Sequence, residues 1–256
     1  MDFHSIHEPV RSALVRLEDI AENARRKYET QYSVFLDAET VVLAKQFVRA
    51  PEGFEIGFFG GYPEAERCIF GVWPEYEADE ATEHFPLDLL KISCPPQKTL
   101  THRDCLGSLL GLGIKREMIG DILCDERIFY VFVSRKISSY IITNLEKIGS
   151  AGVRIKLIST DDFTVPQPKT ETKGIFIMSN RLDAILAGAL DLSRGKAADL
   201  IHAARVSVNH ICRTETSMKL EEGDLLSVRG FGRFRVGKTG NQSRKGRTYL
   251  EIIKYI

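Results

Sequence analysis

The sequence predicts an α+β protein with three domains, and three regional patterns lead to that prediction. Residues 1–76 combine two helical patterns with a pair of short strands, which indicates a small α/β domain. Residues 77–160 alternate strands and helices, and residues 175–256 carry many basic side chains among short helices and strands. Residues 161–174 contain two prolines and few large apolar residues, which is typical of a linker.

The amino-terminal domain is expected to begin with a long amphipathic helix. Apolar residues recur at helical spacing from Val10 to Ala24, and a second helix is predicted after Asp37. Residues 54–59 and 68–72 are predicted to pair as strands on either side of a double glycine. The region up to residue 73 contains 8 Lys and Arg against 12 Asp and Glu, so direct binding of phosphate is not expected there.

The second domain shows the element order βαββαβ. This order predicts a four-stranded antiparallel sheet with two helices on one face, as in ferredoxin-like domains and RNA-recognition motifs. Residues 127–133, the expected central strand, lack the glycine and aromatic signature of RNA-recognition motifs, so we do not expect RNA bases to stack on this sheet. The expected elements are strands at 87–94, 122–124, 128–133 and 153–158, and helices at 101–112 and 136–148.

The third domain contains two short helical patterns followed by short strands. Ser193 can cap the second helix, whose first turn then holds Arg194 and Lys196. Two cations beside free N–H groups at the positive end of a helix suit a phosphate group. The order of elements over residues 181–236 resembles the S-four (αL-type) RNA-binding domain. This resemblance places six residues near RNA: Arg181, Ser193, Arg194, Lys196, Arg205 and Asn209.

The sequence departs from the S-four pattern at two turns. Ala204 stands where the family usually has a glycine at the end of the second helix, and His210 stands where a glycine often follows the asparagine. A left-handed helix end costs a residue other than glycine roughly 1 kcal/mol. The sequence alone therefore does not define how the chain turns into the following strand.

Basic residues are concentrated in the third domain, although the whole chain is neutral. From Gly174 onward there are 14 Lys and Arg against 8 Asp and Glu, a net charge of +6, so the preceding residues carry −6. Residues 225–250 contain no Asp or Glu, and their basic residues are interleaved with Phe231, Phe234, Tyr249 and glycines. This composition favours phosphate binding and the stacking of unpaired nucleotide bases. The basic residues added to the candidate RNA-binding set are Arg229, Arg233, Arg235, Lys238, Arg244, Lys245 and Arg247.

Two segments outside the third domain are distinctive. Residues 57–67 read GFFGGYPEAER, and residues 101–117 read THRDCLGSLLGLGIKRE, followed by GDIL at 120–123. These segments look like the signatures of YlmH-type proteins, which are bacterial S-four-domain proteins often encoded among cell-division genes, with a cyanobacterial branch linked to photosystem II. The resemblance covers essentially the whole chain. It implies binding to structured ribosomal RNA or tRNA on a large ribosomal subunit that carries an obstructed peptidyl-tRNA, and support for the rescue of stalled nascent chains.

Composition argues against several other classes of protein. No apolar stretch approaches the ~20 residues that span a bilayer, and the amino terminus lacks the pattern of a signal peptide, so we expect a cytoplasmic protein. The 5 cysteines are widely spaced and include no Cys-x-x-Cys pair, so we expect buried reduced thiols. The 6 histidines show no metal-ligand spacing. We therefore expect no metal and no cofactor, and we expect a monomer.

Two alternatives remain beside a non-enzymatic RNA-binding adaptor. Pseudouridine synthases often carry S-four domains and use an aspartate within a His-Arg-Leu-Asp segment, and Asp104 follows His102 and Arg103 here but lacks the leucine. Those enzymes also usually place the S-four domain first, ahead of a larger catalytic domain. The other alternative is that the acidic first domain docks onto a protein partner and that RNA binding only tethers the chain. We expect the adaptor.

Overall fold

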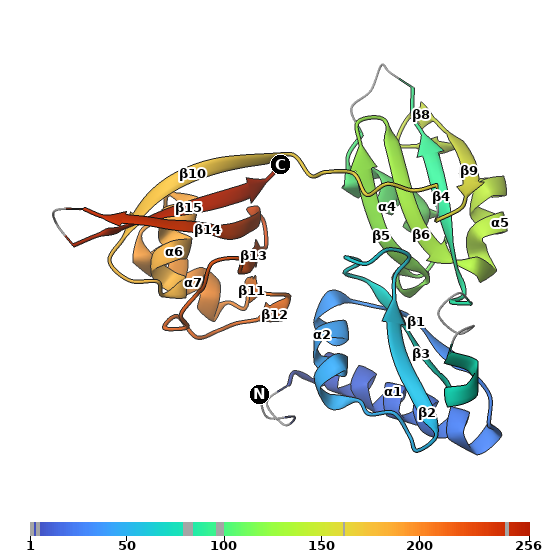
Figure 1. Ribbon diagram of the computed structural model, residues 1–256. Coiled ribbons are helices and arrows are strands. Elements are labelled where there is room, and N and C mark those ends of the chain that lie inside the picture. Colours follow the sequence, from blue (N-terminus) through green and yellow to red (C-terminus); the bar gives the residue numbers. More distant parts are fainter. Residues whose placement is uncertain (1–2, 4–5, 79–83, 96–99, 161, 244–245) are drawn as a thin grey trace. The chain divides into compact units, whose positions relative to one another are not determined.

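The computed structural model describes the chain except for residues 1–2, 4–5, 79–83, 96–99, 161 and 244–245 (Figure 1). The chain divides into two compact units, Met1–Pro166 and Gln167–Ile256. The first two regions expected from the sequence thus lie in one unit, because they share a hydrophobic core.

The amino-terminal part of the first unit packs helices on a small antiparallel sheet. The helix α1 (Glu8–Lys27) buries the predicted stripe that includes Leu14 and Leu17, and α2 (Ala38–Phe47) is capped by Asp37, which accepts a hydrogen bond from the Thr40 N–H at 2.9 Å. The strands β1 (Gln31–Leu36), β2 (Phe54–Phe59) and β3 (Cys68–Pro74) form a sheet in the order β1-β3-β2. A short 3-10 helix, η2 (Glu75–Glu77), follows β3.

The rest of the first unit has the expected order of elements. The strands β4 (Leu87–Ser93), β5 (Ile119–Asp125), β6 (Ile128–Ser134) and β9 (Arg154–Ile158) form an antiparallel sheet in the order β5-β6-β4-β9. The connections include the helices α4 (His102–Gly111) and α5 (Arg135–Asn144) and the 3-10 helix η3 (Arg116–Met118). The second helix ends at Asn144 rather than at residue 148, because β7 (Lys147–Ile148) turns back to pair with β8 (Ala151–Gly152).

The two faces of this four-stranded sheet have different coverings. Leu90 and Val131 point to the face that packs against α4 and α5. The alternate residues Leu89 and Phe132 point to the opposite face, where the Phe132 ring lies 5.3 Å from the Tyr62 ring. The residues on this opposite face form a second hydrophobic core with the amino-terminal part. This second core joins the sheet to the amino-terminal part, and the two parts fold together.

A carboxylate on β5 fixes the loop that enters this second core. Asp121 accepts hydrogen bonds from the Tyr62 hydroxyl at 2.9 Å and from the N–H groups of Glu66 and Arg67 at 2.7 and 3.2 Å. Burial raises the pKa of Asp121, although the hydrogen bonds from these donors oppose the increase. Gly61 has φ +102, and a Cβ at this position would lie 2.2 Å from the Phe132 ring, so the close approach requires glycine.

The linker expected over residues 161–174 is shorter in the structure. Phe163 packs its ring 5.0 Å from the Tyr130 ring and 5.5 Å from the Phe132 ring, so it belongs to the core of the first unit. The strand β10 (Thr170–Ile177) already begins at Thr170. Residue 161, also within the expected linker, lies outside the described residues.

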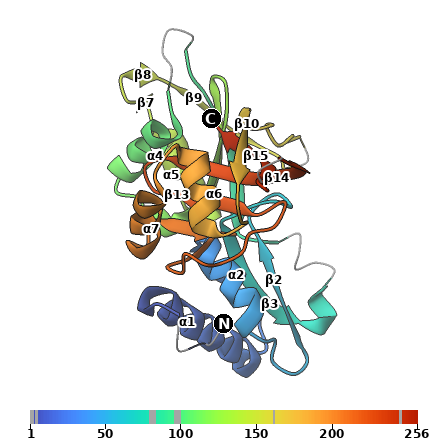
Figure 2. The ribbon, with the colours of Figure 1, turned by 90° about the vertical axis from the view of Figure 1, so that its left-hand side faces the viewer.

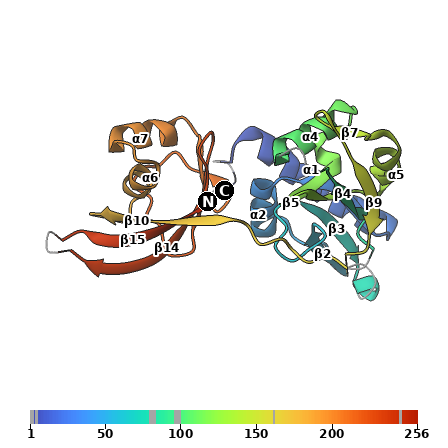
Figure 3. The same ribbon diagram turned by 90° about the horizontal axis from the view of Figure 1, so that it is seen from above.

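The second unit is a six-stranded antiparallel sheet with two helices on one face (Figures 2 and 3). The helices are α6 (Leu182–Leu190) and α7 (Arg194–His202). Both bury apolar side chains against the sheet, including Leu186 and Ile201. The strand order is β10-β15-β14-β13-β11-β12, where the later strands are β11 (Val206–Val208), β12 (Ile211–Cys212), β13 (Leu225–Val228), β14 (Gly232–Gln242) and β15 (Thr248–Tyr255).

We expect Asp121→Ala to lower the free energy of unfolding of the first unit by about 2 kcal/mol, because three donors would lose their acceptor in a partly buried site. Tyr62→Phe removes one of these donors and should cost about 1 kcal/mol. Urea unfolding of the full chain measures both values. Equal stability of the Asp121→Ala variant and the parent protein would show that the carboxylate does not hold the loop.

The turn after α7 gives a second stability prediction. Ala204 has φ +52, so the residue at the expected glycine position is in the left-handed conformation. Ala204→Gly should raise the free energy of unfolding by about 1 kcal/mol, because glycine adopts this conformation without strain. The neighbouring Ala203 has φ −75, and Ala203→Gly should instead lower stability. Denaturant midpoints that move in the same direction for both variants would contradict this explanation.

Candidate nucleic-acid interface

The amino-terminal ends of α6 and α7 meet at one buried carboxylate. We call Arg181, Asp183, Ser193, Arg194 and Lys196 the helical corner. Arg181 precedes α6, Asp183 lies in its first turn, and Ser193 caps α7, as the sequence predicts, by accepting a hydrogen bond from the Lys196 N–H at 3.3 Å. The corner thus gathers four of the residues predicted from the sequence.

Asp183 orients two of the predicted arginines. Its carboxylate accepts hydrogen bonds from Arg181 at 3.1 and 3.3 Å and from Arg194 at 2.6 Å. Asp183 is only 7% exposed, whereas the two arginine side chains are 40% and 58% exposed. Burial by itself would raise the pKa of Asp183, but the hydrogen bonds and charges of Arg181 and Arg194 lower it below its ordinary value.

The helical corner retains positive charge toward solvent. Arg181, Arg194 and Lys196 contribute three cations against the single carboxylate of Asp183. The first turn of α7 also presents N–H groups that have no acceptor within the helix, and Ser193 satisfies only that of Lys196. The helix dipole adds to the positive potential at the same place. This arrangement suits a phosphate group.

Three further predicted residues lie where β11 and β13 begin and end. Arg205 donates a hydrogen bond to the carbonyl of Arg229 at 2.9 Å, which holds its guanidinium against the end of β13. The side chain of Asn209 donates to Asp224 at 2.8 Å and accepts from the Leu225 N–H at 2.9 Å. Both polar groups of Asn209 therefore have partners within the unit, and the structure gives this residue a role in holding β11 to β13.

The predicted arginines on β14 lie on the sheet face opposite to α6 and α7. Phe234 and Val236 are buried in the core beneath the helices, so the alternate residues Arg233 and Arg235 point away from them. Arg235 donates a hydrogen bond to the Tyr255 hydroxyl at 2.8 Å. The structure therefore does not bring all the predicted residues into one surface.

The tip of the β14–β15 hairpin is only partly described. Lys238 and Arg247 are exposed, and the predicted residues Arg244 and Lys245 lie outside the described residues. The suggestion that Phe234 stacks on bases is wrong, because its side chain is 2% exposed and belongs to the core. Phe231, in contrast, is 40% exposed.

Asp104, on which the enzymatic alternative depends, has a structural partner. It forms a capping box with Thr101 at the start of α4, accepting from the Thr101 N–H at 2.8 Å and from its hydroxyl at 2.7 Å. These hydrogen bonds lower the pKa of Asp104. The carboxylate therefore serves to begin a helix.

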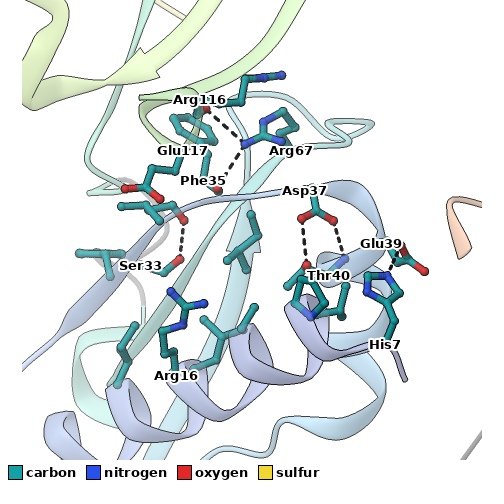
Figure 4. A pocket seen from close by; sticks show the side chains of 18 residues that line it. His7, Arg16, Ser33, Phe35, Asp37, Glu39, Thr40, Arg67, Arg116 and Glu117 are labelled. Carbon is teal, nitrogen blue, oxygen red and sulfur yellow. Dashed lines mark hydrogen bonds and ion pairs between the residues drawn. The ribbon is translucent and has the colours of Figure 1, made fainter. Parts of the chain in front are cut away.

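The first unit contains a cavity of about 760 Å³ beside α1 and β1 (Figure 4). Arg67 and Arg116 contribute to its wall, and sequence reasoning did not single them out. Arg67 donates to the carbonyls of Ile119, Phe35 and Arg116 at 3.0, 3.3 and 3.4 Å. Burial lowers the pKa of Arg67 and lowers that of Arg116 to about 10. Since Arg67 joins three backbone segments, its evident role is structural.

Other expectations from composition can be compared with the described part of the chain. Cys68 and Cys105 are buried as expected, but Cys94 and Cys212 are only half-buried and Cys124 is exposed, so the expectation of buried thiols was wrong for Cys124. Among the described residues, no three His, Cys, Asp or Glu side chains are grouped closely enough to hold a metal ion. No described helix has both the length and the apolar character needed to cross a membrane.

The fold and the helical corner define a two-unit α+β protein with a cationic site where two helix ends meet. The chain belongs to the YlmH family. It is 32% identical over 223 residues, covering 86% of each chain, to "Ribosome-associated protein quality control protein P2" of Bacillus subtilis (strain 168). Residues 81–162 match the family model described as "Putative RNA-binding domain in YlmH". The resemblance seen in the sequence is confirmed.

A solved structure supports the fold. The "Cell division protein ylmH from Streptococcus pneumoniae" matches with a TM-score of 0.51 and 19% identity, covering 62% of this chain and 98% of that chain. At this identity the similarity concerns the fold alone. The matched family model lies on the βαββαβ region, whereas the candidate residues chosen from the sequence all lie in the second unit.

The lowered pKa of Asp183 predicts a pH-dependent contribution to stability. The ion pairs should stabilise the folded state fully above the ordinary Asp pKa of 3.8, and this stabilisation should be lost as the pH falls below that value toward the lower pKa of the folded state. The test measures the free energy of unfolding of the parent protein and of an Asp183→Asn variant at several pH values across this acid range. The difference in stability between them should shrink as the pH falls. A difference that stays constant would contradict the assignment.

Proposed function

We propose that this protein is a non-enzymatic adaptor that binds structured ribosomal RNA or tRNA on the large ribosomal subunit in the cytoplasm and supports rescue of stalled nascent chains. The family relationship supports the proposal, since the Bacillus subtilis relative is named as a ribosome-associated quality control protein. The matched family model, described as an RNA-binding domain, also supports it.

The observation that carries the proposal is the pairing of Arg181 and Arg194 on Asp183. A buried carboxylate that holds two partly exposed guanidiniums in place reduces the entropy that each arginine would lose on binding a phosphate. The first turn of α7 supplies N–H groups beside them. Such a site binds the RNA backbone without reading its sequence, and its affinity depends on released counterions.

The βαββαβ region supplies a second set of cations. Arg154 and Lys156 on the edge strand β9 are exposed, and Lys156 pairs in register with Lys91 on β4. The row of the sheet that includes Leu89 and Phe132 is covered by the aromatic core, so stacking of bases on that row is blocked. We therefore propose that this region adds phosphate contacts along β9.

The non-enzymatic part of the proposal rests on Asp104. Its carboxylate is used by the capping box, and an aspartate that acts on a uridine would need to be available to the substrate. A protein-docking role for the acidic amino-terminal part is compatible with the adaptor, because a tether to RNA and a contact with protein involve different surfaces.

We expect Arg194→Ala to weaken binding of the full chain to structured RNA about tenfold at moderate salt, equally for different sequences, because one phosphate contact is lost. The slope of log affinity against log salt should fall by about 1. Fluorescence anisotropy with a labelled tRNA or ribosomal RNA hairpin, at several salt concentrations, measures both effects.

Two matched variants sharpen this experiment. Lys27→Ala removes an exposed cation from the end of α1 and should leave the affinity unchanged. Lys156→Ala removes a cation from β9 and should weaken binding less than Arg194→Ala. If Lys156→Ala weakened binding and Arg194→Ala did not, the principal RNA contact would lie in the βαββαβ region and the assignment to the helical corner would be wrong.

A further inference from the structure

An aromatic ring lies along the outer face of the sheet in the second unit. Tyr249 on β15 points away from α6 and α7, since its neighbour Leu250 is buried beneath them. A Cβ at Gly174 on β10 would lie 2.5 Å from Cε2 and from the hydroxyl oxygen of Tyr249, and a Cβ at Gly240 on β14 would lie 2.8 Å from Cδ1. Glycines on both neighbouring strands therefore make room for the ring to lie against the sheet.

Phe176 extends this aromatic surface. It is the register partner of Tyr249 on β10, and the two ring centroids lie 5.6 Å apart with an angle of 69° between the ring planes. Phe176 is 58% exposed, and Tyr249 is half-buried, so both rings present area to solvent. Packing within the unit does not account for an exposed phenylalanine beside a ring seated over two glycines.

Cations surround this aromatic surface. Arg247 precedes Tyr249 by two residues, Lys238 precedes Gly240 by two residues, and both are exposed. Among the described residues of β10, β14 and β15, Glu251 is the acid on the same face, and it pairs in register with Gly174. Positive charge therefore predominates at the end of the sheet where the hairpin begins.

We propose that Tyr249 and Phe176 form a stacking platform for an unpaired RNA base, with Arg247 and Lys238 contacting its flanking phosphates. This inference rests on the proposed function and adds the kind of nucleotide that is bound. Aromatic rings stack on bases of any identity, and nearby cations hold the backbone of the same strand. The helical corner holds structured RNA, and the platform accepts a nucleotide that leaves the helix.

The surface fits a base better than a protein partner. A stable protein interface buries about 800 Å² on each partner, whereas two rings and a few neighbouring side chains match the area of one or two bases. The exposed basic side chains of Arg247 and Lys238, at the border of an apolar patch, also suit an anionic ligand.

The test uses the full chain and two RNAs. One is a single strand of about 10 nucleotides carrying 2-aminopurine at its centre, and the other is a fully paired hairpin of matched charge. Tyr249→Leu removes the aromatic ring, and Tyr249→Phe retains it. We expect Tyr249→Leu to weaken binding of the single strand about tenfold and to reduce quenching of the 2-aminopurine, while Tyr249→Phe stays within about twofold of the parent protein.

The hairpin and a glycine variant complete the design. Hairpin binding should be unchanged by Tyr249→Leu and weakened by Arg194→Ala. Gly240→Ala places a methyl group against the ring and should reduce quenching as Tyr249→Leu does. If the Tyr249→Leu variant bound the single strand and quenched its 2-aminopurine as the parent protein does, the platform proposal would be wrong. The proposal of RNA binding by this protein would be unaffected.

Two other outcomes would also overturn the platform. If the Tyr249→Leu variant bound neither the single strand nor the hairpin and had a lower melting temperature, the ring would only support the fold. Failure of the parent protein to bind either RNA would overturn the platform and the proposed function together.

Discussion

The second unit depends on the ion pairs that the buried carboxylate of Asp183 forms with two arginines. The carboxylate joins the start of α6 to the start of α7 through Arg181 and Arg194. The first N–H groups of α6, those of Leu182 and Asp183, donate to the carbonyls of Met218 and Thr216. The loop after β12 is thereby tied to the same point. A charge buried at this position is tolerated because two guanidiniums satisfy it, and the same pairing leaves both cations facing solvent.

The first unit depends in a similar way on a polar group beside an aromatic core. Asp121 holds the loop that carries Tyr62, and Tyr62 packs on Phe132. Phe163, from the segment that leaves the four-stranded sheet, closes over the same ring. This covering explains why a sheet with the strand order of a ferredoxin-like domain does not present its aromatic residues as an RNA-recognition motif does. The RNA contacts proposed for this region come from exposed cations on the edge strand β9.

Local rules predicted part of the helical corner in the second unit. Ser193 as a cap follows from short-range geometry, which the sequence carries directly, whereas the left-handed turn at Ala204 is seen only in the structure. The strands β10 and β15 were not predicted, because their pairing joins residues far apart in the chain. Without that pairing, the burial of Phe234 and the seat of Tyr249 over Gly174 could not be derived.

Some side chains suit two roles, and the sequence does not decide between them. Asn209 matches an RNA-facing position of the S-four pattern, yet its amide bridges Asp224 and Leu225. The expected linker is longer than the one in the structure, because Phe163 is a single aromatic residue among polar ones, and only the structure shows the rings that it meets. The order of strands and helices in the βαββαβ region, in contrast, followed from periodicity alone.

Site-specific photocrosslinking would show directly whether the helical corner contacts RNA. A photoreactive residue would replace Lys196 at the helical corner or Lys156 on β9, and each full-length protein would be bound to purified large ribosomal subunits carrying peptidyl-tRNA. We expect crosslinks from position 196 to ribosomal RNA or tRNA, stronger than those from position 156. Crosslinks from position 156 alone, with none from position 196, would contradict it.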